Sequence, residues 1–308
     1  MDLTQTPLAR SVRGIGYSIR SGDPDFADLP AKLDEAEALG VDFVELPLFC
    51  WTLIAGGRVM GERLDALKRA TRGRPFGYTA HGPLAINLME APARLPAHAA
   101  LLDAAITVAQ ALEAVHLVIH TGCVRDPDET FAVAYARQRE ALQRAGDRAG
   151  RAGVTLCVEN IFRFAPMRET ASPSRLAGEI DAVAHPCVRA TLDVSHAYLR
   201  CADGKLDPRA EIAALAPYAR HIHAHDSFGR PSASWAMDEA ERLGLGEGDL
   251  HLPLGWGSLP WEELARSLVP EPGAILNLEL HGRYWSELPA QVDALRRLAG
   301  RAALPRVA

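Results

Sequence analysis

Several features that mark particular protein classes are missing from this chain of 308 residues. Its N-terminus, MDLTQTPLARSVRG, has no apolar segment like that of a secretory signal, and no run approaches the roughly 18 apolar residues that span a membrane. The formal charge of -6 leaves no basic excess for binding a nucleic-acid backbone. We therefore expect a cytoplasmic protein that does not enter a membrane, and the charge balance disfavours nucleic acid as a partner.

Cysteine is scarce, and motifs for nucleotide binding are absent. The five cysteines are odd in number and lack CxxC spacing, which is typical of reduced thiols in the cytoplasm. No GxGxxG or GxxxxGK[ST] follows an apolar run, which disfavours a doubly wound nucleotide-binding sheet. No linker, low-complexity tract or charge block divides the chain, so we expect a single domain over residues 1–308.

Strand-like and helix-like segments alternate about eight times along the chain. The expected strands are 13–17, 41–47, 76–81, 115–120, 154–159, 189–194, 220–225 and 274–280. The expected helices are 30–40, 61–70, 96–114, 130–152, 173–184, 207–216, 260–268 and 286–303. Alternation of this kind favours parallel strands with crossover helices. Eight such units in a chain of this length predict an α/β fold, a single (β/α)8 TIM barrel.

Nine residues that can bind metal occur one after another at the ends of successive apolar, strand-like runs. They are His81, His120, Glu159, Asp193, His196, His223, Asp249, His251 and Glu279. Because the carboxyl ends of barrel strands meet at one mouth, we expect these side chains to converge there. Imidazole and carboxylate groups without thiolates suit zinc, manganese or iron, and disfavour a Cys-type structural zinc site. The pattern predicts a metalloenzyme.

Other histidines are interpreted differently. A single strand-end histidine is more often a hydrogen-bonded structural residue than a ligand, but nine candidates on one rim outweigh that reading. His98 and His185 lie in polar contexts and are expected at the surface. His116, His221 and His225 share the strand parity of predicted ligands, but their flanking patterns differ, and we leave them out.

Burial of Glu159 in a barrel would be costly without a neighbouring cation. A metal ion offers that compensation most directly. The alternative is an ordinary salt bridge with Arg163 or Arg283.

Several short motifs together carry a family resemblance. They are HGPLAINL at 81–88, VEN at 158–160, LDVSHA at 192–197, IHAHDS at 222–227, DLHLPLGWG at 249–257 and LEL at 278–280. In order and spacing they resemble the xylose-isomerase-like TIM-barrel superfamily, also called the AP endonuclease 2 family. That superfamily includes endonuclease IV and many sugar phosphate isomerases and epimerases. The resemblance covers nearly the whole chain.

The resemblance implies a divalent metal cofactor of one to three ions, with zinc favoured and manganese as the alternative. In endonuclease IV the matching pattern holds three zinc ions. The implied groups are His81, His120 and Glu159; Glu159, Asp193, His223 and Glu279; and His196, Asp249 and His251. In the sugar epimerases the second group alone holds one metal, and residues matching Glu159 and Glu279 are catalytic because they move the substrate proton.

Two enzyme functions are therefore compatible with the site. The first is metal-dependent isomerisation or epimerisation of a small sugar, sugar phosphate or related hydroxy-carbonyl compound, with Glu159 and Glu279 as acid and base. The alternative is a zinc-dependent phosphodiesterase or AP endonuclease with a trinuclear cluster. A non-catalytic metal- or sugar-binding barrel is a third reading, which two intact glutamates disfavour.

Two features favour the sugar enzyme. The loop after His81 reads HGPLA, where endonuclease IV carries bulky residues that enter DNA. Glu45 resembles an acidic residue that meets substrate in the isomerase and epimerase branch. The alternative for Glu45 is a partner of a metal ligand or of Arg20.

The segment 226–248 is longer than its counterpart in endonuclease IV and is expected to be a lid or an interface. As a lid it would bring Phe228, Arg230 and Trp235 over a small ligand, with Arg230 binding a phosphate or carboxylate. A helical contact between subunits is the alternative, and both a monomer and a homodimer fit the resemblance. Arg163 is a further candidate for contact with an anionic substrate group.

Overall fold

A closed barrel of parallel strands forms the centre of the computed structural model, which describes residues 3–21, 23, 25–232, 235–236 and 238–302. The strands are β1 (Val12–Ser18), β2 (Phe43–Pro47), β5 (Gly77–His81), β6 (Ala114–His120), β8 (Thr155–Glu159), β10 (Val188–Asp193), β11 (Ala219–Ala224) and β12 (Ala274–Leu278). Their order around the barrel is β1-β12-β11-β10-β8-β6-β5-β2, so strands that follow one another in the chain are neighbours. The predicted TIM barrel is confirmed.

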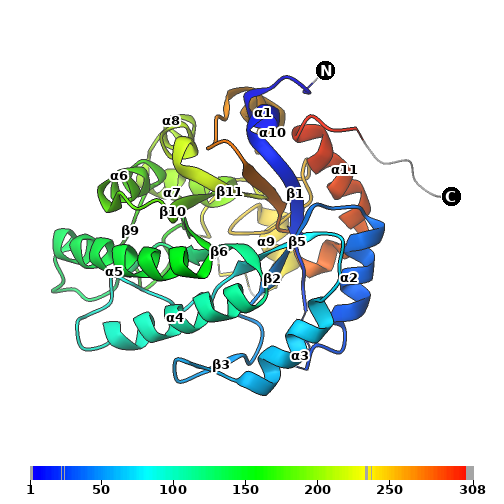
Figure 1. Cartoon of the computed structure of the whole chain (residues 1–308). Helices are drawn as coiled ribbons and strands as arrows, with labels where there is room; N and C mark the ends of the chain where they lie inside the picture. The colour runs from blue at the N-terminus through cyan, green and yellow to red at the C-terminus, as the bar shows by residue number, and fades with distance from the viewer. Residues whose placement is uncertain (1–2, 22, 24, 233–234, 237, 303–308) are drawn as a thin grey trace.

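Helices cover the outside of the barrel (Figure 1). They are α1 (Pro7–Ser11), α2 (Leu29–Ala38), α3 (Gly61–Thr71), α4 (Leu95–Ala111), α5 (Phe131–Ala152), α6 (Pro173–Val183), α7 (Val194–Gly204), α8 (Pro208–Leu215), α9 (Glu239–Leu245), α10 (Trp261–Ser267) and α11 (Leu288–Leu298). Short 3-10 helices occur at η1 (Ala216–Tyr218) and η2 (Gly282–Glu287). None of the described helices combines the length and the apolar character that crossing a bilayer requires.

The eight predicted helices are present with shifted ends, and the described residues form three more, α1, α7 and α9. α4 stops at Ala111, before the predicted end at 114, and α11 stops at Leu298 rather than at 303. α7 was not predicted. It begins directly after β10 because the side chain of Asp193 accepts a hydrogen bond from the backbone N–H of His196 at 2.7 Å and so caps the helix.

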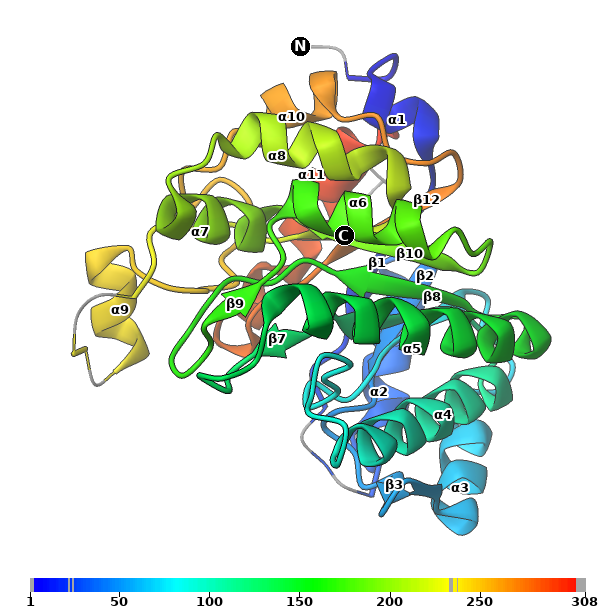
Figure 2. The same ribbon diagram turned by 90° about the vertical axis from the view of Figure 1, so that its left-hand side faces the viewer.

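Small additions extend the end of the barrel where the strands terminate. Two antiparallel pairs, β3 (Ile54–Ala55) with β4 (Arg58–Val59) and β7 (Cys123–Val124) with β9 (Glu169–Thr170), lie in loops. Figure 2 shows α9 projecting beyond the barrel at the end where β7 and β9 lie. The segment 226–248 therefore reaches the mouth side, although residues 233–234 and 237 lie outside the described residues.

The inside of the barrel changes character along its axis. At the amino-terminal end the ring of Phe43 packs against β1, where a Cβ on Gly14 would lie 2.5 Å from a ring carbon, so only glycine admits the ring there. Closer to the mouth the inward residues are polar and fully buried, among them Glu45, His221 and Asn277. A barrel core usually consists of branched aliphatic side chains, so this buried polar layer indicates a functional site.

Candidate metal centre

The nine predicted ligands all lie at the mouth, but not all at strand ends. His81, His120, Glu159 and Asp193 are the last residues of their strands, His223 is the penultimate residue of β11, and Glu279 directly follows β12. His196 instead lies in the first turn of α7, and Asp249 and His251 lie in the loop after α9. The prediction that these three end strand-like runs is wrong, because the carboxyl end of the barrel is completed by a capped helix and a loop.

A central group surrounds one ring nitrogen of His223. Its Nδ1 lies 3.4 Å from Glu159 Oε1, 3.5 Å from Glu279 Oε2 and 3.9 Å from Asp193 Oδ2. This buried nitrogen has no hydrogen-bond partner among the described residues, while Nε2 of the same ring faces Glu45 at 3.3 Å. Three buried carboxylates around an unpaired imidazole nitrogen are a donor set for a divalent cation, which would also offset their mutual repulsion. The residues therefore fit a bound metal.

A second group lies on the other side of Glu159. His81 Nε2 is 3.2 Å and His120 Nε2 is 3.7 Å from Glu159 Oε2, whereas Oε1 of this carboxylate faces His223. Burial lowers the pKa of His120 to about 4, although the charge of Glu159 opposes the shift. The imidazole of His120 is therefore neutral at pH 7 and has a lone pair to offer. Glu159 therefore lies between this second group and the central group.

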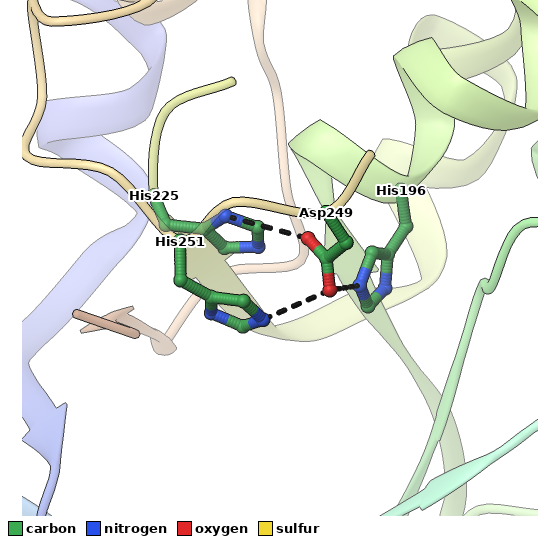
Figure 3. A group of neighbouring side chains, drawn as sticks. All are labelled: His196, His225, Asp249 and His251. Carbon is green, nitrogen blue, oxygen red and sulfur yellow. Dashed lines mark hydrogen bonds and ion pairs between the residues drawn. The ribbon is translucent and has the colours of Figure 1, made fainter. Parts of the chain in front are cut away.

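A third group gathers around Asp249. Its Oδ2 lies 3.2 Å from His196 Nε2 and 3.0 Å from His251 Nε2, and its Oδ1 lies 3.9 Å from His225 Nδ1. Figure 3 shows the carboxylate between His196 on one side and the rings of His225 and His251 on the other. His225 was not among the predicted ligands, yet it lies in this group. Its position two residues after His223 was the only sequence signal for it.

A deeper layer supports the central group from below. Glu45 Oε1 accepts a hydrogen bond from the Ser18 hydroxyl at 2.7 Å, and Oε2 lies 3.1 Å from His221 Nε2. His221 Nδ1 in turn is 3.3 Å from His116 Nδ1. Glu45 is fully buried and does not line the mouth cavity, so the structure places it as a partner of the predicted ligand His223. His221 and His116 were likewise not among the residues predicted to belong to the site.

The carboxylates of the central group are ionised. Burial acts to raise the pKa of Glu159, but the charge of His223 and hydrogen bonds from neighbouring histidines outweigh it and hold the pKa well below its usual range. Burial also acts to raise the pKa of Glu279, but the charges of His223 and His251 outweigh it and lower that pKa. Around His196 the carboxylates of Asp193 and Asp249 overcome burial and raise the imidazole pKa well above 6.5. The mouth therefore attracts positive charge.

A cavity of about 460 Å³ opens above these groups. Cavities of roughly 300–1,000 Å³ hold small molecules. Its apolar wall comprises Phe49, Leu84, Ala85, Ile86, Ile161, Phe162, Phe164, Pro166 and Met167. Its polar floor includes His81, His120, Glu159, His196, Asp249, His251 and Glu279, and Arg20 and Arg125 lie on its sides.

Besides Glu45, three further residues predicted to bind substrate do not line this cavity. The Nε of Arg163 bonds to Asp203 Oδ2 at 2.6 Å, Arg230 is exposed, and Trp235 is 88% exposed. Arg20, whose Nε donates to Leu280 O at 3.2 Å, and Arg125 line the cavity instead. Sequence reasoning missed this difference because it cannot tell which loop arginine folds inward.

Two further expectations are corrected. The salt-bridge alternative for Glu159 is wrong, because Arg163 pairs with Asp203 and Arg283 lies 3.7 Å from Glu239. His98 is half-buried rather than a surface residue, since its Nδ1 accepts a hydrogen bond from the backbone N–H of Asn87 at 3.1 Å. His185 is also half-buried, with Nε2 3.3 Å from Asp147.

Comparison with known proteins gives a family match and structural likenesses. The family model described as "Xylose isomerase-like TIM barrel" matches residues 33–301. No curated protein sequence matches the chain significantly. The crystal structure of a D-tagatose 3-epimerase-like protein has a TM-score of 0.66 and 16% identity, covering 92% of this chain and 98% of that chain.

Two further solved structures are similar in fold. D-allulose 3-epimerase from Methylomonas sp. in complex with D-allulose has a TM-score of 0.65 and 17% identity, covering 95% of each chain. The 3-keto-D-glucoside 4-epimerase from E. coli has a TM-score of 0.65 and 13% identity, covering 92% of this chain and 98% of that chain. At such identities the likeness establishes the shared fold.

Proposed function

The chain belongs to the xylose isomerase-like TIM-barrel family, and from this premise we propose that it is a metal-dependent isomerase or epimerase of a small sugar, sugar phosphate or related hydroxy-carbonyl compound. The observation that carries the proposal is the unpaired Nδ1 of His223, set among three ionised carboxylates beneath a cavity of about 460 Å³. The epimerases of similar fold act on ketoses or keto-glucosides by their names, which supports this substrate class.

Glu159, Asp193, His223 and Glu279 would hold the metal, with zinc favoured and manganese as the alternative. When bound, the metal polarises a carbonyl oxygen and its neighbouring hydroxyl, which makes the carbon-bound proton between them more acidic. Glu159 and Glu279 are the acid and base that exchange this proton. Their lowered pKa values keep both carboxylates ionised at pH 7, as a general base requires.

The cavity walls supply binding and exclusion of water. Phe49 and Phe162 offer apolar surface for the C–H faces of a sugar, and His81 and His120 reach its hydroxyl groups from the floor. Arg20 and Arg125 are the arginines on the cavity sides, so they replace Arg163 and Arg230 in our proposal as partners for an anionic or strongly polar substrate end.

The segment 226–248 is proposed as a lid or subunit contact rather than as a direct source of ligand contacts. Glu239, the first residue of α9, lies 3.4 Å from His281 Nδ1 and 3.7 Å from Arg283 Nη2. These exposed pairs are weak and can break and re-form as the segment moves.

A second candidate is the phosphodiesterase, favoured by three adjoining ligand groups at one mouth, two of which share Glu159. A trinuclear centre generates hydroxide and clamps both the attacking and the leaving oxygen of a phosphodiester. It requires three ions per chain, whereas the proton exchange proposed here requires one ion at the central group.

Proton exchange in heavy water tests the proposal directly. The metal-loaded protein is incubated with ketohexoses in D2O, and NMR follows deuterium incorporation at the carbon beside the carbonyl. We expect incorporation with the wild type and with Glu62→Gln, an exposed control on α3, and loss with Glu159→Gln and Glu279→Gln. Hydrolysis of phosphodiesters without any exchange into ketoses or aldoses would establish the second candidate instead.

A further inference from the structure

The apolar wall of the cavity comes mainly from two loops. Every wall residue except Phe49 belongs to residues 82–90, which follow β5, or to residues 160–168, which follow β8. We propose that the substrate is a sugar derivative with an apolar aryl or alkyl substituent, and that this wall binds the substituent while the polar floor binds the sugar. The proposal rests on the proposed function and narrows its substrate class.

The wall is continuous from the floor of the cavity to its rim. At the floor the ring of Phe162 lies 5.2 Å from the ring of His196, measured between centroids. Phe164 continues the aromatic surface outward, with its ring 6.0 Å from that of Phe162. Phe164 is 54% exposed, and Leu84 of the other loop is 48% exposed. A substituent on a sugar bound at the floor would therefore contact apolar side chains as far as the solvent.

The charged side chains near this wall are engaged elsewhere. Neither Arg163 nor Arg168 lines the cavity, and the Nε of Arg163 is held by Asp203 at 2.6 Å. Arg125 lines the cavity, but its Nη2 donates to Glu90 Oε2 at 2.7 Å, which offsets its charge. A phosphate group placed against this wall would lose water without gaining an unpaired cation. The wall therefore suits an apolar substituent better than a phosphate.

Hydrogen bonds hold both loops in place without a substrate. Asn87 Oδ1 accepts from the backbone N–H of Cys123 at 3.0 Å, and Asn87 Nδ2 donates to the oxygen of Cys123 at 2.9 Å. These bonds fasten the first loop to β7. The backbone N–H of Arg168 donates to Val124 O at 2.7 Å and fastens the end of the second loop to the same strand. A wall that is already formed loses little conformational freedom when a ligand binds.

Burial of apolar surface gives the size of the expected preference. A substituent that covers Phe164 and Leu84 removes their exposed surface from water, which favours binding. Hydroxyl groups of a free sugar at the same wall would lose water without hydrogen-bond partners. Full burial of one methylene group corresponds to about a fourfold gain in affinity. Because the rim is half exposed, we expect about two- to fourfold per methylene, or about 10- to 60-fold between a methyl and a butyl substituent.

The test compares methyl and butyl β-D-glucosides on the metal-loaded protein. Isothermal titration calorimetry measures the dissociation constants of the two unmodified glucosides, which carry no ketone and so bind without proton exchange. Deuterium incorporation measures kcat/KM for the same pair oxidised to the ketone at C3. The substituent makes the anomeric carbon an acetal, so the carbonyl group must lie on the ring, and C3 has hydroxyl-bearing carbons on both sides.

Two variants locate the effect on the molecule. The first combines Leu84→Ala with Phe164→Ala and removes the outer part of the wall. The control is Val133→Ala on α5, which shortens a side chain that is 52% exposed and does not line the cavity. The readout is the ratio of butyl to methyl compound within each protein, so a change in basal activity cancels.

We expect the butyl glucoside to bind about 10- to 60-fold more tightly than the methyl glucoside to the wild type and to Val133→Ala, with a similar ratio in kcat/KM. The ratio should fall towards one in the wall variant. A ratio near one in the wild type, a ratio that the wall variant leaves unchanged, or tighter binding of glucose 6-phosphate than of butyl glucoside would overturn the proposal. Absence of exchange with both oxidised glucosides would instead refute the epimerase function, because calorimetry measures the ratio without turnover.

Discussion

Replacing Glu45 by Gln should weaken metal binding at the central group about 10- to 100-fold while leaving the KM for substrate at saturating metal nearly unchanged. Glu45 is fully buried and faces His223 Nε2 at 3.3 Å, on the side of the ring opposite the three carboxylates. Its negative charge makes the Nδ1 of His223 a stronger electron donor and fixes the ring. The neutral amide removes the charge and keeps the shape.

The size of the effect follows from these contacts. Burial acts to raise the pKa of Glu45, but His223 and His221 outweigh it and keep the carboxyl ionised. A 10- to 100-fold loss of metal affinity corresponds to about 1.4–2.7 kcal/mol. The amide also places N–H groups where His221 and Ser18 now find an oxygen, and one unsatisfied buried donor costs about 1–3 kcal/mol of folding stability.

The assay measures the metal dissociation constant by chelator competition, and urea unfolding followed by circular dichroism measures stability. Glu62→Gln on the exposed face of α3 serves as the control for loss of one carboxylate. The opposite pattern, a raised KM with unchanged metal affinity, would refute the reasoning. It would mean that Glu45 meets substrate, as the family resemblance implied.

Three further predictions concern catalysis, a surface pair and the metal itself. Glu159→Gln should lower kcat by about 10²- to 10⁴-fold with an unchanged far-ultraviolet circular dichroism spectrum, and near-normal turnover would contradict the site. The hydrogen bond from Arg163 lowers the pKa of Asp203, so their pairing stabilises the fold above about pH 4 and this contribution disappears as pH falls through the folded pKa. Arg163→Gln should therefore lower the free energy of unfolding, measured in urea, by about 0.5–1 kcal/mol at pH 7 and by less at pH 3. It should leave KM unchanged. A large rise in KM would instead mean that Arg163 contacts substrate. Removing metal with a chelator should lower the melting temperature. Adding free zinc at about 100 times its dissociation constant should then raise the free energy of unfolding by about 2.7 kcal/mol. An unchanged melting temperature after chelation would mean that the folded protein binds no metal.

Local patterns predicted much of the fold. Apolar runs of strand length alternate with segments of helical periodicity, and this alternation predicts parallel strands that are neighbours in the barrel. Because parallel strands end at the same rim, the pattern also places His81, His120, Glu159 and Asp193 together there. α7 escaped prediction because LDVSHA is apolar enough to continue a strand. The capping bond from Asp193, which turns the chain into a helix, is a matter of geometry.

The sequence predicts which types of residue form the candidate site, but it does not predict which of them contact one another. His225 has the strand parity of His223, but nothing near it in the sequence shows that a loop brings Asp249 to 3.9 Å from its Nδ1. Arg20 and Arg163 both follow strands closely in the sequence. Only the folded loops turn Arg20 towards the cavity and Arg163 towards Asp203.

The sequence by itself determined the α/β alternation, the barrel and the rim of histidines and carboxylates, because side-chain periodicity and strand direction are local properties of the chain. Tertiary structure alone decided which nitrogen of each histidine is held by a carbonyl or carboxylate and which faces a shared centre. It also decided that Glu45 lies beneath His223 and that His225 completes the group around Asp249. These are contacts between segments far apart in the chain, and their distances and electrostatics exist only once the barrel has closed.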